Sequence, residues 1–331
     1  MGGVPRTASQ PDQDVSAALA VRDLDVSART VERLRLAGLL ATRVQQRPCG
    51  TRGGSISRLA PGEVDRAAYA HALRVKHGSY SRATLAMFVD GRYSVPKDRL
   101  ESAYDESLAS ARCLIDRHAG GASDDRSAAV EVAGWIAGQI CKRRDYRTLR
   151  KRLRRDPPLG MTVRRSLENA ATDMMLLLVR GRADFPDGLR EMLVVTGVAD
   201  VLNDPASGQP TEPLDTQLLE ELSPHLSLTA LAAGVRSARL HELERARDFA
   251  KALRTFAKVY GIDLKRTHGL RAGFIWLLAG ATSDMAIAYA TPMLAVVMRA
   301  HPELTQQWFE LMARWTPIFA QNPSNTGANL G

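Results

Sequence analysis

The sequence predicts a mainly all-α protein, in which a helix-turn-helix and a short β-hairpin near the N-terminus precede an all-α helical bundle. Aromatic residues make up only 5% of the 331 residues, while alanine, leucine, valine and arginine are abundant. This composition favours helices over sheets. Apolar residues also recur at the three- and four-residue spacing of helices along most of the chain. The length exceeds one average domain, so we expect two or three domains.

The first third of the chain alternates short helical patterns with turns. Ser27 is the expected N-cap of a short helix that stops at Gly38. A later helix that opens at Pro61 carries an apolar stripe of Val64, Ala68 and Leu73. The expected elements are a disordered tail over 1–14, helices over 15–22 and 28–37, a hairpin within 41–60, and helices over 61–75, 81–89 and 97–117.

Gly120 and Gly121, followed by a polar run, mark the expected boundary between a first domain (15–119) and a second (122–320). Beyond them the pattern is helical to the end. The stretch LNDPASGQPTEPLD (202–215) is the clearest internal linker and a point of subdivision. The expected helices are 127–140, 143–154, 161–180, 187–201, 226–260 in one or two pieces, 270–281, 284–298 and 302–319, with a flexible tail over 321–331.

The positive charge of the chain is concentrated in two segments. The formal net charge is +9. The segment from Ser27 to Arg58 contains seven arginines and one glutamate. The segment from Cys141 to Arg155 contains nine lysines and arginines and one aspartate. The remainder of the chain is therefore net negative. Such localised charge is what a surface that binds a polyanion needs.

Residues 15–22, the turn DLDV (23–26) and the helix over 28–37 have the order of a helix-turn-helix. Arg29 and Arg33 lie four residues apart, so they share a helix face from which both reach phosphates or guanine edges. The inward side of the helix would be apolar. The candidate DNA-binding residues, hydroxyls and arginines, are Ser27, Arg29, Thr30, Arg33, Arg35, Arg43, Arg52 and Arg58.

The stretch VSARTVERLRLAGLL (26–40) resembles the recognition helix of the MerR family of transcriptional regulators. The resemblance continues through GGSISRL (53–59), the helix over 61–75 and GSYSRATLAMFVDG (78–91). It implies a winged helix-turn-helix that reads double-stranded DNA as a homodimer. Arg29, Arg33 and Arg35 would engage the major groove, and Arg43, Arg52 and Arg58 would anchor the wing.

In that family the position of the helix over 97–117 is occupied by a dimer helix, which pairs as an antiparallel coiled coil. The resemblance therefore implies that this helix carries the dimer contact. Its loose stripe of apolar and aromatic residues fits that expectation. The stripe consists of Leu100, Tyr104, Ala111, Ile115 and His118.

The second basic segment, CKRRDYRTLRKRLRR (141–155), is a helical pattern with one apolar stripe of Tyr146, Leu149 and Leu153. Two interpretations remain open: a solvated helix face, or contact with DNA or RNA phosphates or an acidic protein partner. Like charges four residues apart destabilise a helix, which favours a polyanion. The candidate residues are Lys142, Arg143, Arg144, Arg147, Arg150, Lys151 and Arg154.

We expect neither a metal nor a cofactor, and no enzymatic activity. The spacing of Cys113, His118 and Cys141 matches no standard metal site, so packed core thiols are the expectation. The sequence contains no phosphate-binding loop, dinucleotide fingerprint, zinc-protease motif or nucleophile elbow. An all-α enzyme would require a polar pocket in the C-terminal bundle.

Sparse cysteines indicate a reducing compartment, and the chain lacks the apolar core of a signal peptide, so we expect a cytoplasmic protein. The apolar stretch 272–298 is interrupted by Asp284 and Pro292, which predicts two buried helices and no membrane span. Within 226–260, a stripe at helical spacing predicts a bundle core face or, with nearby aromatics, the lining of an effector pocket. The stripe is Leu243, Ala246, Ala250, Leu253, Ala257 and Tyr260, and the aromatics are Phe249, Phe256, Phe274, Trp276, Trp308 and Trp315.

The sequence therefore predicts a DNA-binding transcriptional regulator whose C-terminal region serves oligomerisation, a small-molecule effector or a protein partner. The alternative is a helical interaction or scaffold protein, or a non-specific nucleic-acid binder, that has lost sequence-specific reading. Glu32 favours the alternative, because the MerR family usually has an arginine directly after its Thr-Val pair. A carboxylate there would repel phosphate if it faced DNA. RNA binding centred on 141–155 is a variant of this alternative.

Overall fold

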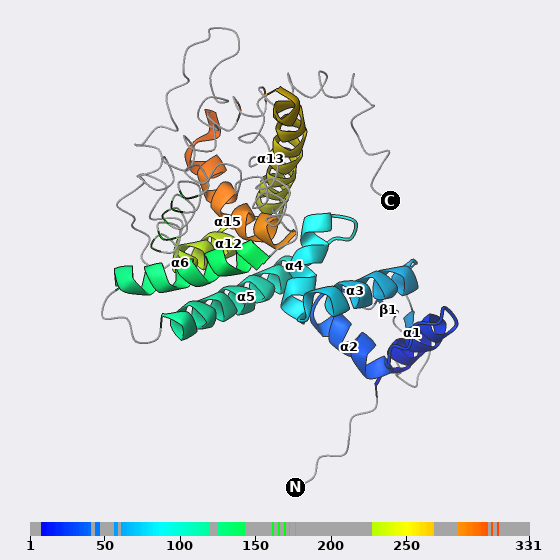
Figure 1. Ribbon diagram of the computed structural model, residues 1–331. Coiled ribbons are helices and arrows are strands. Elements are labelled where there is room, and N and C mark those ends of the chain that lie inside the picture. Colours follow the sequence, from blue (N-terminus) through cyan, green and yellow to red (C-terminus); the bar gives the residue numbers. More distant parts are fainter. Residues whose placement is uncertain are drawn as a thin grey trace. The chain divides into compact units, whose positions relative to one another are not determined.

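The computed structural model describes residues 8–40, 44–46, 56–58, 61–119, 125–142, 227–267 and 284–303, with seven single helical positions between 161 and 310 (Figure 1). This part of the chain is mostly helical, as predicted. Contacts divide the chain into two units, Met1–Ala109 and Ser110–Gly331, called here the N-terminal and C-terminal units. The predicted helices at 143–154, 187–201 and 270–281, the linker at 202–215 and the tail at 321–331 lie outside the described residues.

The described elements follow the predicted order, with nine helices and one two-stranded sheet. None of these helices is both long and apolar enough to cross a membrane. Their bounds are α1 Gln10–Ala20, α2 Ala28–Leu36, β1 Val44–Gln46, β2 Ile56–Arg58, α3 Glu63–His77, α4 Tyr80–Asp90, α5 Lys97–His118, α6 Asp125–Lys142, α12 Leu228–Ser237, α13 Leu240–Thr267 and α15 Asp284–Ala300.

Helix α1 begins at Gln10, so the prediction of a disordered tail through residue 14 was wrong. Proline interrupts a helix when it lies in the interior. Pro11 lies in the first turn, where proline is favoured because its missing N–H costs no hydrogen bond. Val15 and Leu19 are fully buried, and so is Asp12. The polar start of this helix is thus part of the core of the N-terminal unit.

A tight turn joins α1 to α2 and fixes the two helices against each other. The backbone N–H of Leu24 donates to the carbonyl of Leu19 (3.1 Å). Asp23 adopts a left-handed backbone (φ 58°), which aspartate tolerates better than most residues. The Ser16 hydroxyl donates to the carbonyl of Val26 (2.6 Å), so a polar bond closes the turn from the α1 side. These short-range bonds hold α1 and α2 side by side (Figure 1).

The hairpin expected within 41–60 is present as two antiparallel strands. Val44 pairs with Arg58 and Gln46 with Ile56. Helix α3 follows and packs on α1, α2 and α4. Its buried face consists of Glu63, Ala67, Ala70 and Leu73, with the predicted Val64 and Ala68 only half-buried.

Helix α4 is enclosed on nearly all sides. Ser79 caps its start by accepting a hydrogen bond from the backbone N–H of Arg82 (3.2 Å), and Gly91 ends it at φ +79°. Small and apolar side chains let its neighbours approach closely. Within α4 the buried residues are Ser81, Ala83, Thr84, Leu85, Ala86, Met87, Phe88 and Val89.

Residues of α5 that were predicted to form the dimer stripe make contacts within their own chain. Leu100 and Tyr104 are fully buried, together with the neighbouring positions of the first turns. Further along, Ile115 packs against Ala129 and Val132 of α6. His118 stacks on Trp135, with ring centroids 4.3 Å apart. The division between the two units falls within α5.

Cys113 is exposed and free, so its prediction as a packed core thiol was wrong. It lies on α5 between the half-buried positions Ala111 and Ile115, off the face that packs inward. No group of three or more potential metal ligands occurs among the described residues.

Three helices of the C-terminal unit, α12, α13 and α15, pack together. Arg254 pairs with Asp284 (3.2 Å) and Arg299 with Glu242 (2.8 Å), so α13 and α15 run antiparallel. Gly234 of α12 lies against Val296 of α15. The predicted segment 226–260 thus forms two helices. Its expected core face is confirmed for Leu243, Ala246 and Ala250, all buried, whereas the aromatics Phe274, Trp276, Trp308 and Trp315 lie outside the described residues.

Glu242 should make the stability of this bundle depend on acid pH. Its carboxylate accepts a hydrogen bond from the backbone N–H of Arg239 (2.6 Å) at the start of α13. This bond is the main reason why the pKa of Glu242 lies below its ordinary value of 4.5; burial opposes the shift, and Arg299 adds smaller lowering effects. A depressed pKa stabilises the folded state above the ordinary value, and the contribution is lost as pH falls through the folded pKa.

We therefore expect Glu242→Gln to lose less stability than wild type between about pH 6 and about pH 3. The free energy of unfolding would be measured by urea denaturation monitored by circular dichroism. Glu244→Gln on the same helix is the control, because among the described residues its carboxylate accepts no backbone N–H. Equal pH profiles for wild type and Glu242→Gln would contradict the assignment.

Candidate nucleic-acid interface

The start of α2 is built by Ser27, as the sequence predicted. Its backbone is extended (φ −63°, ψ 149°), and its Oγ accepts a hydrogen bond from the backbone N–H of Thr30 (3.3 Å). The two hydroxyls also bond each other, with 2.9 Å between Oγ and Oγ1. Ser27 and Thr30 are thus engaged in capping the helix.

The two sides of α2 have opposite chemistry. Val31 and Leu34 are fully buried and hold the helix on the core of the N-terminal unit. Arg29 and Arg33 are exposed on the outer side, one turn apart. A fixed inner face with two outward guanidinium groups is an arrangement that suits contact with an anionic surface.

The end of α2 is closed by backbone bonds across Gly38. The N–H of Gly38 donates to the carbonyl of Arg35 (2.9 Å), and the N–H of Leu39 donates to the carbonyl of Leu34 (3.0 Å). This pattern requires a left-handed residue, and Gly38 has φ +77°. The hydroxyl of Thr84 in α4 donates to the carbonyl of Ala37 (3.1 Å), which satisfies a further group at the helix end.

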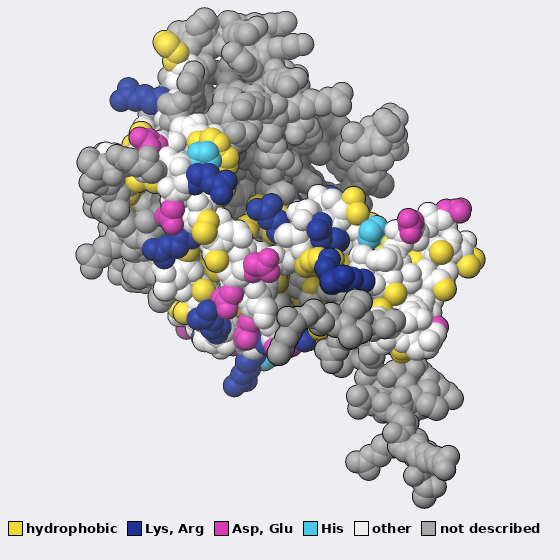
Figure 2. Space-filling model, turned by 90° about the horizontal axis from the view of Figure 1, so that it is seen from below, with side chains coloured by type: hydrophobic (Ala, Val, Ile, Leu, Met, Phe, Trp, Pro, Cys, Tyr) yellow, Lys and Arg dark blue, Asp and Glu magenta, His cyan; other side chains and the backbone are white. Residues whose placement is uncertain are grey.

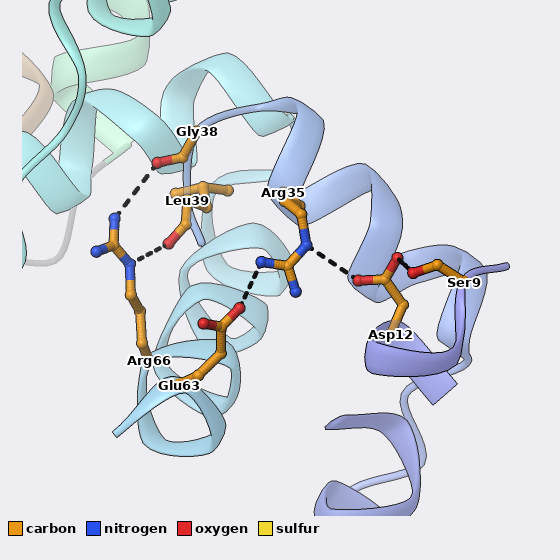
Figure 3. A network of polar contacts seen from close by, with 7 residues as sticks. All are labelled: Ser9, Asp12, Arg35, Gly38, Leu39, Glu63 and Arg66. Atoms are coloured by element: carbon orange, nitrogen blue, oxygen red, sulfur yellow. Dashed lines mark hydrogen bonds and ion pairs between the residues drawn. The ribbon is translucent and has the colours of Figure 1, made fainter. Parts of the chain in front are cut away.

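Arg35 faces inward and does not belong with the candidate DNA contacts. Its Nε donates to Asp12 of α1 (3.0 Å), and its Nη1 donates to Glu63 of α3 (2.5 Å; Figure 3). The side chains are 12%, 0% and 3% exposed for Arg35, Asp12 and Glu63. Ser9 also donates to Asp12 (2.7 Å). We therefore correct the sequence interpretation: Arg35 is a structural cation that joins α1, α2 and α3.

Arg66 of α3 binds the end of α2 from the other side. Its Nε donates to the carbonyl of Leu39 (2.6 Å), and its Nη2 donates to the carbonyls of Gly38 (3.4 Å) and Ser94 (2.8 Å). Burial lowers the pKa of the Arg66 guanidinium, an effect that Glu63 opposes. An arginine pKa is so high that the group stays charged. Arg66 therefore fixes where α2 ends (Figure 3).

A row of two aromatic rings with a cation at each end extends from Arg66. Its guanidinium lies 5.4 Å from the Tyr93 ring centroid, Tyr93 lies 5.8 Å from Tyr69, and Arg92 lies 4.8 Å from Tyr69. Cation–π contacts of this kind contribute about 0.5–1 kcal/mol each at exposed sites. Sequence reasoning missed Arg66 and this row. The adjacent Arg92–Tyr93 pair and the three-residue spacing of Arg66 and Tyr69 were the available signals.

The remaining predicted site residues are only partly placed. Arg58 lies in β2, opposite Val44 in the register, and its side chain is outside the description. Arg43 and Arg52 are outside the described residues. Lys142 ends α6. The rest of the second basic patch also lies outside them: Arg143, Arg144, Arg147, Arg150, Lys151 and Arg154.

On the face shown in Figure 2, exposed lysine and arginine side chains of the described residues are interspersed with acidic and apolar ones. The candidate interface is therefore defined by the exposed arginines on the outer side of α2. Comparison with protein-family models, with curated proteins and with solved structures finds no match to the chain.

Proposed function

We propose that the N-terminal unit binds duplex DNA through the outer side of α2, as the recognition helix of a MerR-like winged helix-turn-helix, and that the chain is a transcriptional regulator. The observation that carries this proposal is that the arginines of α2 lie on two different sides of the helix. Arg29 and Arg33 are exposed together, whereas Arg35 is bound to buried carboxylates. Exposed arginines on a rigid helix can pair bidentately with guanine O6 and N7 in the major groove.

In this proposal the β1–β2 hairpin is the wing, and Arg43, Arg52 and Arg58 contact the flanking phosphates. The order of elements supports it, because the hairpin follows α2 directly and precedes α3. The excess of arginine over acid between Ser27 and Arg58 supplies the attraction to phosphate. The cations of 141–155 would add contacts that do not depend on sequence.

A homodimer that reads a two-fold site completes the proposal. Leu100 and Tyr104 are buried within their own chain, so the dimer contact would use other residues. The helices α12, α13 and α15 would serve oligomerisation or bind a small-molecule effector or a protein partner. A bundle stabilised by its own core and by ion pairs between α13 and α15 supports such a separate role.

Replacing Arg33 with alanine should weaken binding to the selected DNA site about 5- to 150-fold, which corresponds to about 1–3 kcal/mol for one arginine–guanine pair. Arg29→Ala should act similarly. Purified full chain would be incubated with random duplex DNA at about 150 mM salt, and the enriched site would be used for affinity measurements. Arg82→Ala is the matched control, an exposed arginine on α4, and should leave the affinity unchanged.

Glu32 supports a second candidate, a non-specific nucleic-acid binder. It lies half-buried on α2 beside the two exposed arginines, where its charge opposes phosphate. A variant with the cations of 142–155 replaced by glutamine separates the two candidates. Weak, salt-sensitive binding that only this variant abolishes would overturn sequence-specific reading. Enrichment of a two-fold motif that Arg33→Ala removes would exclude the second candidate.

A further inference from the structure

Helix α2 carries an apolar side chain on its outer side. Leu36 is 62% exposed, whereas Val31 and Leu34 on the same helix are fully buried. At about 100° per residue, Leu36 lies within about 60° of Arg29 and Arg33 around the helix axis. These three residues, called the outer stripe, therefore face one surface.

The fold of the unit does not need the Leu36 side chain. The helix end is closed by the backbone bonds of Gly38 and Leu39 and by the Thr84 hydroxyl. The inward contacts of α2 come from other positions, and Arg35 makes its buried ion pairs from the inner side. Leu36 thus lies outside the core that the described residues form, and it adds apolar surface to the outer stripe.

We propose that Leu36 recognises the 5-methyl group of a thymine in the half-site whose guanines Arg29 and Arg33 contact. This inference rests on the proposed DNA binding. Among the four base pairs, only those with thymine present a methyl group in the major groove, and guanine presents two acceptors that suit arginine. The outer stripe therefore matches a surface with acceptors and a methyl group. Glu32 lies one turn before Leu36 on the same side, so the two guanidinium groups and this carboxylate leave a net positive charge, which favours an anionic duplex as the occupant over an apolar protein surface.

The spacing of the outer stripe gives the expected spacing of the bases. Leu36 follows Arg29 by seven positions, which is about 10.5 Å along a helix. Successive base pairs are about 3.4 Å apart. The thymine is therefore expected about three base pairs from the guanine that Arg29 contacts.

Deoxyuridine tests this inference, because it pairs with adenine as thymine does but lacks the methyl group. Each thymine of the enriched site would be replaced in turn at about 150 mM salt. One replacement in each half-site should weaken binding by wild-type protein about fourfold, the effect expected for one methyl group removed from contact. Leu36→Ala should bind both versions equally, at the weaker level.

Val75→Ala is the matched control, since Val75 on α3 is 68% exposed and lies outside the outer stripe. It should keep the preference for thymine, and thermal unfolding should be unchanged in both variants. Equal binding of thymine and deoxyuridine by wild-type protein would overturn the role of Leu36 while leaving DNA reading intact. A preference for thymine over deoxyuridine that survives in Leu36→Ala would also overturn the role of Leu36 while leaving DNA reading intact. Failure to enrich any DNA sequence would instead overturn both the inference and the proposed function.

Discussion

Replacing Arg35 with methionine should lower the free energy of local unfolding around α1, α2 and α3 by about 3–5 kcal/mol. Asp12 and Glu63 are 0% and 3% exposed, so both carboxylates would lose their cation without gaining access to water. Methionine preserves most of the volume of the arginine stem, so the effect reports the lost charge. Hydrogen exchange of the three helices in the full chain measures it.

The control is Arg22→Met, which breaks another ion pair of the same unit. Arg22 and Asp65 are also 2.5 Å apart, but their side chains are 49% and 62% exposed. Water screens such a pair, so its loss should cost less than about 1 kcal/mol. Combining Arg35→Met with Asp12→Asn and Glu63→Gln should recover part of the lost stability. Similar effects for Arg35→Met and Arg22→Met would show that the buried network does not hold the three helices together.

Replacing Gly38 with alanine should destabilise the same region by about 2–4 kcal/mol. The backbone of Gly38 has φ +77°, which strains any residue with a Cβ. A Cβ at this position would also lie 2.5 Å from both Cβ and Cγ of Arg99. Those atoms are next to the backbone of α5, so they cannot move aside as the end of a long side chain would.

Gly78→Ala separates strain from steric overlap. Gly78 also has φ +77°, but a Cβ there would meet nothing within 4 Å. It should therefore cost only the backbone strain, about 1 kcal/mol. Hydrogen exchange of α2 and α5 measures the cost of Gly38→Ala, and hydrogen exchange of α3 and α4 measures the cost of Gly78→Ala. Equal costs would mean that Arg99 does not press against Gly38.

Elements defined by short-range signals could be predicted from the sequence. Helix α2 begins after Ser27 and ends before Gly38, because a capping hydroxyl and a glycine act on backbone groups within a few residues. The outward position of Arg29 and Arg33 follows from the period of the helix. The prediction failed at the N-terminus, where a disordered tail was expected through residue 14 but α1 begins at Gln10. Proline is favoured in the first turn of a helix, which is where Pro11 lies.

Features that depend on distant partners could not be predicted. Arg35 and Arg33 are the same residue type on the same helix, but Arg35 binds two carboxylates. These partners lie 23 and 28 residues away along the chain. A glutamate is expected at the surface, but Glu63 lies on the buried face of α3, where it pairs with Arg35. That face also includes Ala67 and Ala70 in place of the more apolar Val64. The buried face of α3 thus includes a carboxylate, which hydrophobic spacing alone does not reveal.

The enclosure of α4 bears on how this protein would change over evolutionary time. An amphipathic helix has an outer face on which neutral substitutions accumulate, but between Ser81 and Val89 only Arg82 is exposed. Most substitutions there must conserve volume. The outer stripe of α2 is exposed, so it is under no such packing constraint and can vary independently of the core. Descendants of a common ancestor would therefore keep a sequence close to SRATLAMFV (81–89) and differ more along the outer stripe of α2.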